Sequence, residues 1–560
     1  MSVLTLPDTI RQLAYLSEIR GDAEAAELRA AVQTLDRFSP AELDNLLQAA
    51  RTGPFSALHS FSPSTVRAIR EIALAGDEAA SATMRIRIPW LLRRLLDLGT
   101  ATHAEASTLV RDFGLLTISD LTTAIDDGRI AQLPEPLAQR LSASSHLLTE
   151  EWRSHTLGRA WEILAGVQSA LTTHCRSIER TAFAGDTRRH EPLVTDLVLV
   201  AQTDDAAAVI DCLTRTPGVD DLLHRSGRRA IVGVQHVEVD LRFAGADHFG
   251  PVLFTATGTP RHVAAVTNRR RPGLCAREAE VYTRAGLAWI PPELRSASGE
   301  IERASTGRMP RLLERGDIRG DLHMHSTYSD GQDTIEAMVA AAAALDYEYV
   351  AITDHSANAA ASRTVTLDQL ARQRDEIGRV REQFPGIAIL HGIEVDILAN
   401  GRLDFDDVVL ERLDIVLASL HDAAQQDGPA LTRRCIGAIR HPLVNIITHP
   451  SNQLVGRRAG YPMDYEAIYA AAAETGTALE VDGAPSHLDL DGERARAAVA
   501  AGVTLTVDSD CHRCRALELQ MEFGVGMARR GWVEPQHVLN TRPVAQVRAF
   551  VEAKRAGGRA

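Results

Sequence analysis

The sequence predicts a chain of several domains: a helical N-terminal region, an α+β middle region and a C-terminal α/β barrel. Three observations support this prediction. At 560 residues the chain is several times longer than an average domain. Apolar residues recur at helical spacing through residues 1–150. From residue 319 onward short apolar runs alternate with helical segments, which is typical of a parallel sheet closed into a barrel.

The elements follow in order along the chain. Helical segments are expected over 9–20, 23–38 and 40–51, with no catalytic motif among them. A helix over 157–180 precedes strand-like runs at 193–201, 229–234 and 237–243. Residues 296–318 are polar and charged and are interpreted as a linker. Barrel strands are expected at 349–353, 388–393, 415–420, 444–448, 477–481 and 503–507.

Charge, aromatic content, cysteines and lysines limit the classes of function that the chain can have. The net charge of -14 and the 4% of aromatic residues predict weak nucleic-acid binding, or binding through a local basic face. The six scattered cysteines suit a reducing cytoplasm better than a disulfide scaffold. No signal-peptide-like or membrane-spanning apolar run occurs, so a soluble cytoplasmic protein is expected. Lys554 is the single lysine, which leaves almost no candidate for Schiff-base chemistry.

Nine candidate metal ligands follow the predicted barrel strands, nearly all directly after an apolar run. Because the carboxyl ends of barrel strands form one rim, these side chains are expected to gather at one site. A single histidine is more often a surface or core residue, but nine ligands at successive strand ends are hard to obtain that way. The nine are His323, His325, Asp330, His355, Glu394, His421, His449, Asp510 and His512.

The ligand types indicate the chemistry. Mixed nitrogen and oxygen donors favour Zn²⁺, Mn²⁺ or Fe²⁺ over Ca²⁺. Clustered divalent ions activate a shared water, bind phosphate oxygens and offset charge during an in-line displacement. The pattern therefore predicts a hydrolase of phosphate mono- or diesters. Cys511 and Cys514 enclose His512 in a C-x-x-C, which we interpret as incidental because one pair is half of a structural zinc site.

These residues also carry a family resemblance. H-x-H, the aspartate five residues later, T-D-H, G-x-E, S-x-H, H-P and D-x-H resemble the PHP (polymerase and histidinol phosphatase) family, whose fold is a distorted (β/α)₇ barrel. The resemblance implies three divalent ions, with Glu394 and Asp510 as essential carboxylates. The implied ligands are His323, His325, Glu394 and Asp510 for one ion, Glu394, His421 and His449 for a second, and Asp330, His355 and His512 for a third.

The segment before the barrel resembles the junction of bacterial X-family DNA polymerases (PolX), in which a polymerase core precedes a PHP exonuclease. It reads EVYTRAGLAWIPPELRSASGEIERA and then PRLLERGDIRGDLHMHSTYSDG. By this resemblance residues 1–90 form a small helical domain, 91–152 a helix–hairpin–helix or fingers-like domain and 153–295 the palm and thumb. Residues 296–318 are the linker and 319–560 the PHP domain.

The polymerase half departs from the family pattern at its acids. The family's nucleotidyl-transfer palm has D-x-D on one strand and a third aspartate later. Asp196 and Asp240 occupy the first and third positions and are candidate catalytic residues, but Val198 stands at the second. Two-metal transfer needs carboxylates to hold both ions, and valine offers no lone pair. We therefore expect polymerase activity to be absent or trace.

Candidate phosphate ligands and DNA-binding turns complete the set. Arg188 and Arg189 are the last two residues of the segment GDTRR, which aligns with the family's G-S-x-R-R motif. Asp186 places a negative charge where the family binds a triphosphate. Arg457 and Arg458 lie in the loop after His449 and could border the metal site; for all four arginines a solvated surface role is an equal alternative. The family's G-h-G hairpin turns, whose glycines allow close approach to phosphates, read here as SFS at 60–62, GTA at 99–101 and EPL at 135–137.

The leading hypothesis is a PolX-like, metal-dependent phosphoesterase that acts as a 3′–5′ exonuclease in DNA repair, with cleavage at abasic sites as a further activity. One alternative is a functional X-family polymerase with a nuclease, if another acid replaces Val198. A second is a phosphatase of small phosphate esters. A third treats residues 1–295 as a non-catalytic binding module, which is compatible with the leading hypothesis.

Overall fold

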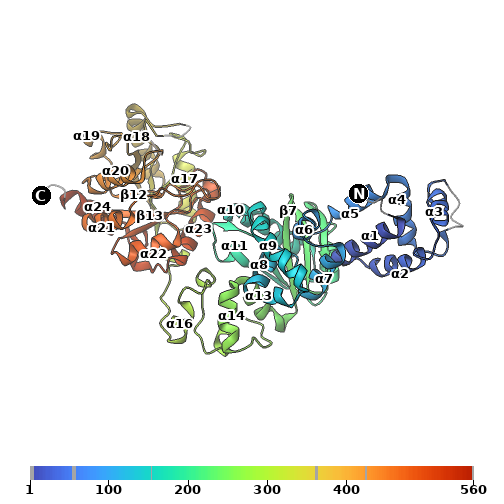
Figure 1. Ribbon diagram of the computed structural model, residues 1–560. Helices are drawn as coiled ribbons and strands as arrows, with labels where there is room; N and C mark the ends of the chain where they lie inside the picture. The colour runs from blue at the N-terminus through green and yellow to red at the C-terminus, as the bar shows by residue number, and fades with distance from the viewer. Residues whose placement is uncertain (1–4, 53–57, 153, 360–362, 423–424, 558–560) are drawn as a thin grey trace. The chain divides into compact units, whose positions relative to one another are not determined.

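The computed structural model describes residues 5–52, 58–152, 154–359, 363–422 and 425–557 (Figure 1). The chain forms two compact units. Unit 1 comprises Met1–His155, Arg159–Arg188 and Val194–Trp289, and unit 2 comprises Thr156–Gly158, Arg189–Leu193 and Ile290–Ala560. The finer division of unit 1 into three domains stays a prediction. Within the described residues, no helix is long and apolar enough to cross a membrane.

Unit 1 begins with helices, as the apolar spacing predicts. They are α1 (Leu6–Arg20), α2 (Ala25–Leu35), α3 (Pro40–Thr52), α4 (Pro63–Ala75), α5 (Asp77–Arg85), α6 (Trp90–Asp97), α7 (His103–Phe113), α8 (Ile118–Asp126) and α9 (Glu135–Glu151). Local signals set the boundaries of α7: a capping box between Thr102 and Glu105 starts it, and Gly114 in the left-handed region ends it. The predicted turn at 135–137 is instead the first turn of α9.

Unit 1 also contains a five-stranded sheet in the order β2-β4-β7-β6-β5, followed by α13 (Phe249–Thr257), α14 (Pro260–Arg269) and α15 (Ala279–Arg284). The strands of the sheet are β2 (Arg180–Phe183), β4 (Leu197–Gln202), β5 (Val219–Arg225), β6 (Arg229–Val234) and β7 (Val237–Ala244). Two predictions are wrong in detail. The run 193–201 breaks before Leu197, and helix α10 (Leu157–His174) stops six residues short of the predicted 180. Leu223 and Ile231 of this sheet share one apolar core with α1–α9.

The sparse cysteines, which suit a reducing cytoplasm better than a disulfide scaffold, nevertheless include one bonded pair. Cys175, just after α10, and Cys212, in α12 (Ala206–Leu213), form a disulfide with 5.8 Å between their Cα atoms. Their sequence separation of 37 residues gave no sign that the two helices meet. The other described cysteines, among them Cys511 and Cys514, are free.

Unit 2 contains a seven-stranded parallel sheet in which every strand lies beside its neighbours in sequence, in the order β14-β13-β12-β11-β10-β9-β8. The strands are β8 (Gly320–Asp321), β9 (Tyr349–Ile352), β10 (Ala388–Asp396), β11 (Ile415–Ser419), β12 (Ile446–Ile447), β13 (Ala478–Asp482) and β14 (Leu505–Asp508). The predicted strands are thus confirmed. Both faces of such a sheet are covered, which explains why the strands read as continuous apolar runs.

The sheet is nearly closed into a barrel. Its two edge strands approach through an isolated parallel bridge between Met324 and Cys511. The Leu322 N–H donates to Asp508 at 2.8 Å, and the His325 N–H donates to the Cys511 carbonyl at 2.9 Å. Helices connect the strands and surround them (Figure 1): α17 (Ile335–Ala344), α18 (Leu367–Gln383), α19 (Asp407–Leu410), α20 (Gly428–Arg440), α21 (Tyr465–Thr475) and α22 (Gly492–Ala500), followed by α23 (Leu517–Arg530) and α24 (Val544–Gly557).

The segment interpreted as a linker is a packed part of unit 2. It contains α16 (Glu300–Ser305), and Glu300 is fully buried. Glu300 accepts from the N–H groups of Ala297 and Ser298 at 2.8 and 2.7 Å. The polar composition suggested exposure, but this buried carboxylate is satisfied by backbone groups of its own segment.

Candidate metal centre

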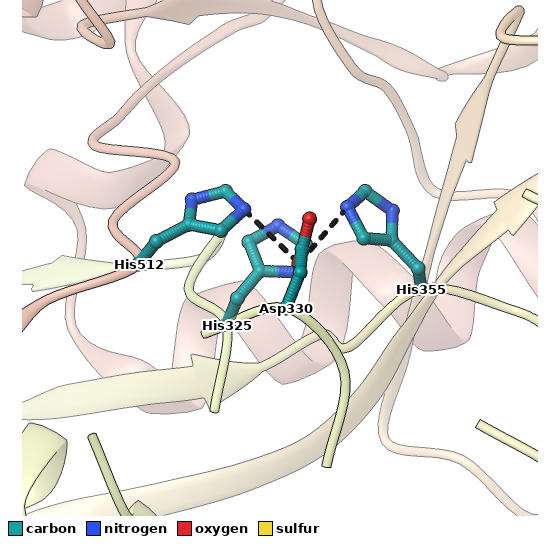
Figure 2. A group of neighbouring side chains, drawn as sticks. All are labelled: His325, Asp330, His355 and His512. Atoms are coloured by element: carbon teal, nitrogen blue, oxygen red, sulfur yellow. Dashed lines mark ion pairs between the residues drawn. The ribbon is translucent and has the colours of Figure 1, made fainter. Parts of the chain in front are cut away.

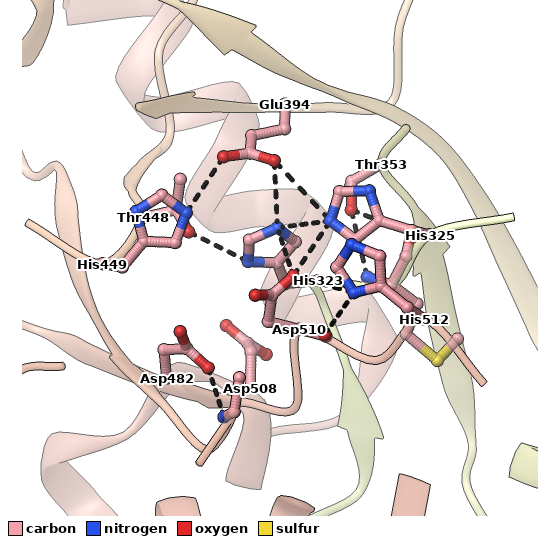
Figure 3. Close-up of polar contacts among 12 residues, drawn as sticks. His323, His325, Thr353, Glu394, Thr448, His449, Asp482, Asp508, Asp510 and His512 are labelled. Atoms are coloured by element: carbon pink, nitrogen blue, oxygen red, sulfur yellow. Dashed lines mark hydrogen bonds and ion pairs between the residues drawn. The ribbon is translucent and has the colours of Figure 1, made fainter. Parts of the chain in front are cut away.

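The strand ends of the barrel bring all nine predicted ligands to one site (Figures 2 and 3). His323 and His325 follow β8, His355 follows β9, and Glu394 lies in β10. The other strand ends supply the remaining ligands. These are His421 after β11, His449 after β12, and Asp510 and His512 after β14, while Asp330 comes from the loop after β8. Parallel barrel strands present their carboxyl ends at one rim, which is why residues spread over 190 positions of sequence converge.

The first group consists of two imidazoles and one carboxylate at the junction of the barrel edges. His325 Nε2 lies 3.1 Å from His323 Nε2 and 3.0 Å from Asp510 Oδ1. His323 Nε2 lies 3.5 Å from the same Asp510 oxygen. Both histidines are fully buried. Donor atoms of three side chains therefore point at one small volume that is closed to bulk water (Figure 3).

Glu394 is the hub of the site. Its Oε1 lies 3.0 Å from His449 Nε2 and 3.6 Å from His421 Nε2, and its Oε2 lies 2.7 Å from His355 Nδ1. Glu394 Oε2 also lies 3.5 Å from His323 Nε2. Burial opposes ionisation of this carboxylate, but His355 and His421 hold its pKa well below the ordinary value. Glu394 is therefore an anion surrounded by imidazoles.

A further group forms around Asp330 (Figure 2). Asp330 Oδ1 lies 3.2 Å from His512 Nε2 and 3.5 Å from His355 Nε2. His325 completes the group, with its ring stacked on that of His512 at 4.2 Å between centroids. The family resemblance implies Asp330, His355 and His512 without His325, so the side chains group slightly differently from that expectation.

The donor set fits divalent metal ions. Buried polar atoms normally have hydrogen-bond partners, yet His325 Nδ1, His449 Nδ1, His355 Nδ1 and Glu394 Oε2 are buried without one. The last two are 2.7 Å apart, but their geometry is not that of a hydrogen bond. Several ligand atoms close together, such as His325 Nε2 at 3.1 Å from His323 Nε2 and 3.0 Å from Asp510 Oδ1, could bind one cation together. Mixed nitrogen and oxygen donors suit first-row divalent ions.

Buried carboxylates that the sequence analysis did not single out hold the ligand loops. Asp354 accepts from the Ser326 and Ser329 N–H groups at 2.8 and 3.0 Å. Asp396 accepts from the His421 N–H at 3.0 Å, and Glu480 contacts His323 Nδ1 at 2.7 Å. The available signal was the acid at the end of each strand, in ITDH, GIEVD and LEVD. Of these motifs, the predicted ligands include His355 in ITDH and Glu394 in GIEVD, and none in LEVD.

The acids of the polymerase half lie in a different environment. Val198 lies opposite Asp240 on the neighbouring parallel strands β4 and β7. The position at which the family has its second strand aspartate is therefore next to the third aspartate. Asp240 accepts from Arg229 Nε at 2.7 Å and Nη2 at 2.9 Å, and from Arg242 Nε at 3.0 Å. Arg229 also reaches Asp120 at 2.8 Å. Arginines thus occupy the bonding positions of this carboxylate.

Asp196 faces the helices instead. Its Oδ2 accepts from the Ser119 N–H at 3.0 Å, and burial raises its pKa to about 6. Burial also opposes ionisation of Asp240, but Arg229 and Arg242 hold the pKa of Asp240 below its ordinary value. Among the described residues, the groups of side chains that could hold a metal ion include neither aspartate.

The four predicted phosphate-binding arginines lie in two places, Arg188 and Arg189 in unit 1 or at its boundary and Arg457 and Arg458 in unit 2. Arg188 donates to both Glu278 oxygens, at 3.1 and 2.7 Å, and Arg189 is buried. Arg458 donates to the Asn452 carbonyl at 2.7 Å, which fixes the loop after His449. Arg457 and Arg458 are both exposed on this loop. Both can meet a ligand from solvent, although the guanidinium of Arg458 is already bonded to Asn452.

Comparison with known proteins agrees with this geometry. The PHP domain family matches residues 321–449. The chain is 30% identical over 577 residues to the DNA polymerase/3′-5′ exonuclease PolX of Bacillus subtilis (strain 168), covering 97% of this chain and 98% of that protein. It is 36% identical over 168 residues to a probable phosphatase of Syntrophotalea carbinolica, covering 29% of this chain and 64% of that protein. A solved histidinol phosphate phosphatase of Lactococcus lactis matches with a TM-score of 0.31 and 17% identity, over 39% of this chain and 95% of that one. The similarity to PolX over nearly both full lengths shows that the chain belongs to the PolX family of bacterial X-family DNA polymerases with a C-terminal PHP domain.

Proposed function

We propose that this protein is a metal-dependent phosphoesterase whose single working active site is the metal centre of unit 2. The observation that carries the proposal is the convergence of nine histidine and carboxylate side chains, several with buried atoms that lack a hydrogen-bond partner. We assign three divalent ions, of Zn²⁺, Mn²⁺ or Fe²⁺, to this site. Glu394 is the ligand that two ions share.

Bound divalent ions supply an activated water, bind phosphate oxygens and offset developing charge. The side chains of this chain do the rest. Glu394 and Asp510 bring negative charge to a buried site and so favour cation binding. Asp330 and His512 lie at the more exposed side, with about 20% and 32% of their side-chain surfaces accessible. We propose that substrate approaches from this side.

For the substrate we propose the 3′ end of DNA, cleaved as a 3′–5′ exonuclease, in a cytoplasmic DNA-repair role with abasic sites as further substrates. Membership of the PolX family supports this proposal. Arg457, exposed beside the ligand loop, is the proposed phosphate contact. With a net charge of -14, DNA binding is expected to be weak.

We further propose that templated synthesis has been lost. Val198 supplies no carboxylate opposite Asp240, and the guanidinium of Arg229 already lies between Asp240 and Asp120. A metal ion at Asp240 would have to displace two arginines from a buried ion-pair network. Removing such partners costs several kcal/mol, on the order of 3–5.

Hydrolysis of small phosphate esters is a second candidate, supported by the similarity of part of unit 2 to a probable phosphatase. The two candidates are separated by comparing a labelled oligonucleotide with a sugar phosphate at equal metal concentration. A kcat/KM for DNA that exceeds that for the sugar phosphate by tenfold or more supports the nuclease. The reverse ratio supports the phosphatase. No hydrolysis of either substrate by metal-loaded protein would refute the phosphoesterase proposal.

A further inference from the structure

Glu480 is a buried carboxylate next to the metal centre that contacts both His323 and the backbone of His449. Glu480 lies in β13 and is fully buried. Its Oε1 lies 2.7 Å from His323 Nδ1. Its Oε2 accepts from the His449 N–H at 2.6 Å and from the Thr448 hydroxyl. A single side chain therefore touches two segments that each carry a proposed ligand.

These contacts fix the proton on His323. An ionised carboxylate only accepts hydrogen bonds, so His323 Nδ1 must carry the hydrogen. The Thr448 hydroxyl, which also lies 2.9 Å from His323 Nδ1 (Figure 3), donates to Glu480 and can accept from the same N–H. Nε2 of His323 then presents its lone pair toward Asp510 and Glu394, each 3.5 Å away. This is the tautomer that a metal ion requires.

The second contact fixes the position of His449. Glu480 holds the His449 N–H, and His449 itself adopts a positive φ of 28°, in a backbone region that residues with side chains rarely occupy. From this position its Nε2 reaches Glu394 at 3.0 Å. Without an acceptor at Glu480, the His449 N–H would be buried and unpaired, which is unfavourable. The loop that carries His449 would then be more stable in a position where this N–H finds another acceptor, away from the site.

An amide cannot replace this carboxylate. Glu480 receives three donors: His323 Nδ1–H, the Thr448 hydroxyl and the His449 N–H. Glutamine offers one acceptor oxygen and one NH₂ donor. Thr448 could rotate its hydroxyl to accept from NH₂, but a backbone N–H cannot. Either His323 or His449 would therefore face a donor.

We propose that Glu480 is a positioning residue that sets the tautomer of His323 and the backbone of His449, and thereby the metal affinity of the site. This inference rests on the proposed function, because it requires metal to bind at these histidines. Carboxylates behind metal-bound histidines typically contribute 10–100-fold in metal affinity. The expected effect of Glu480 lies in that range.

The test uses Co²⁺ as the probe, added to full-length protein after removal of metal with a chelator. Glu480→Gln, Glu480→Ala and Thr448→Val are compared with wild type. Glu348→Gln is the matched control, because Glu348 precedes β9 at the opposite end of a barrel strand and pairs with Arg319. Binding isotherms, visible absorption spectra of the bound Co²⁺ and thermal unfolding without metal are recorded for each.

We expect Glu480→Gln to bind Co²⁺ about 10–100-fold more weakly than wild type, with an altered absorption spectrum. Thr448→Val should show a smaller loss with an unchanged unfolding midpoint, and Glu348→Gln should match wild type. If Glu480→Ala does not fold, the glutamine and Thr448→Val variants still decide the outcome. Affinity within twofold of wild type and an unchanged spectrum for Glu480→Gln would overturn the inference. Failure of wild-type protein to bind Co²⁺ would instead overturn the proposed function.

Discussion

At the residue scale, single side chains decide which half of the molecule can do metal chemistry. In unit 2, Glu394 is ringed by four imidazoles, from His323, His355, His421 and His449. In unit 1, Asp240 accepts hydrogen bonds from two arginines, Arg229 and Arg242. A carboxylate surrounded by lone-pair donors attracts a cation, whereas one already paired with guanidinium groups does not.

Glu394→Gln should lose most metal and most hydrolysis. The change keeps the shape of the side chain but removes the negative charge that four imidazoles share, so we expect at least a 100-fold drop in kcat/KM, equivalent to about 2.7 kcal/mol. Metal content by elemental analysis and phosphoester hydrolysis are measured together. Glu348→Gln serves as the control and should retain both. Full activity in the Glu394→Gln variant would show that the hub assignment is wrong.

Asp240→Ala should destabilise unit 1 without removing any activity. It removes a buried carboxylate and leaves the half-buried Arg229 and Arg242 with fewer partners, which costs at most about 3–5 kcal/mol. Urea unfolding followed by tryptophan fluorescence reports mainly on unit 1, because all tryptophans except Trp532 lie in it. Asp112→Ala, which removes an exposed ion pair with Arg111, should change stability by less than about 1 kcal/mol. Equal stabilities of the two variants would contradict the ion-pair network.

Asp196 should make the stability of unit 1 fall as pH rises. Burial raises its pKa to about 6 from the usual 3.8, so the folded state holds the proton more tightly than the unfolded state. The contribution to stability is fully present below about pH 4 and is lost as pH rises through about 6. Relative to Asp196→Asn, wild type should lose about 2–3 kcal/mol between pH 4 and pH 8. A difference that stays constant over this range would show that the raised pKa is wrong.

At the scale of elements, strand ends and the loops that follow them build the site. The alternation of apolar runs and helices sufficed to predict the six parallel strands β9 to β14. The predicted ligands except Asp330, which lies in a loop, follow from histidines and acids at or just after strand ends. Glu480 and Arg229 could not be predicted this way. Their roles depend on partners 157 and 109 residues away in sequence, which only the folded chain brings into contact. The packed segment 296–318 escaped prediction because its buried polar groups pair with one another.

The loop from His325 to Asp330 offers an element-scale prediction. A Cβ at Gly331 would lie 2.6 Å from both the N and the O of Ser326, and backbone atoms cannot yield as a flexible side chain can. The same Cβ would lie 2.7 Å from the backbone carbonyl carbon of His325, so Gly331→Ala should displace the loop that carries His325 and Asp330 and lower metal content. Gly378→Ala, on the exposed side of α18 with nothing within 4 Å, should bind metal as wild type does. Unchanged metal binding in Gly331→Ala would contradict the predicted displacement of this loop.

At the scale of the whole molecule, two units of one chain have different chemical capacities. Unit 2 contains the nine proposed ligands, whereas unit 1 contains a five-stranded sheet whose acids pair with arginines and with helix N–H groups. The proposal that unit 2 carries the single working active site rests on this contrast.

One reaction tests this account most directly. Full-length protein is mixed with a 5′-labelled primer annealed to a longer template, all four deoxynucleoside triphosphates and Mn²⁺, and the label is followed by length. We predict that the primer becomes shorter with time, that no product exceeds the primer length, and that Glu394→Gln abolishes the shortening while Asp240→Asn does not. Products longer than the primer that disappear with Asp240→Asn would contradict the account, because they would show that unit 1 still catalyses templated synthesis.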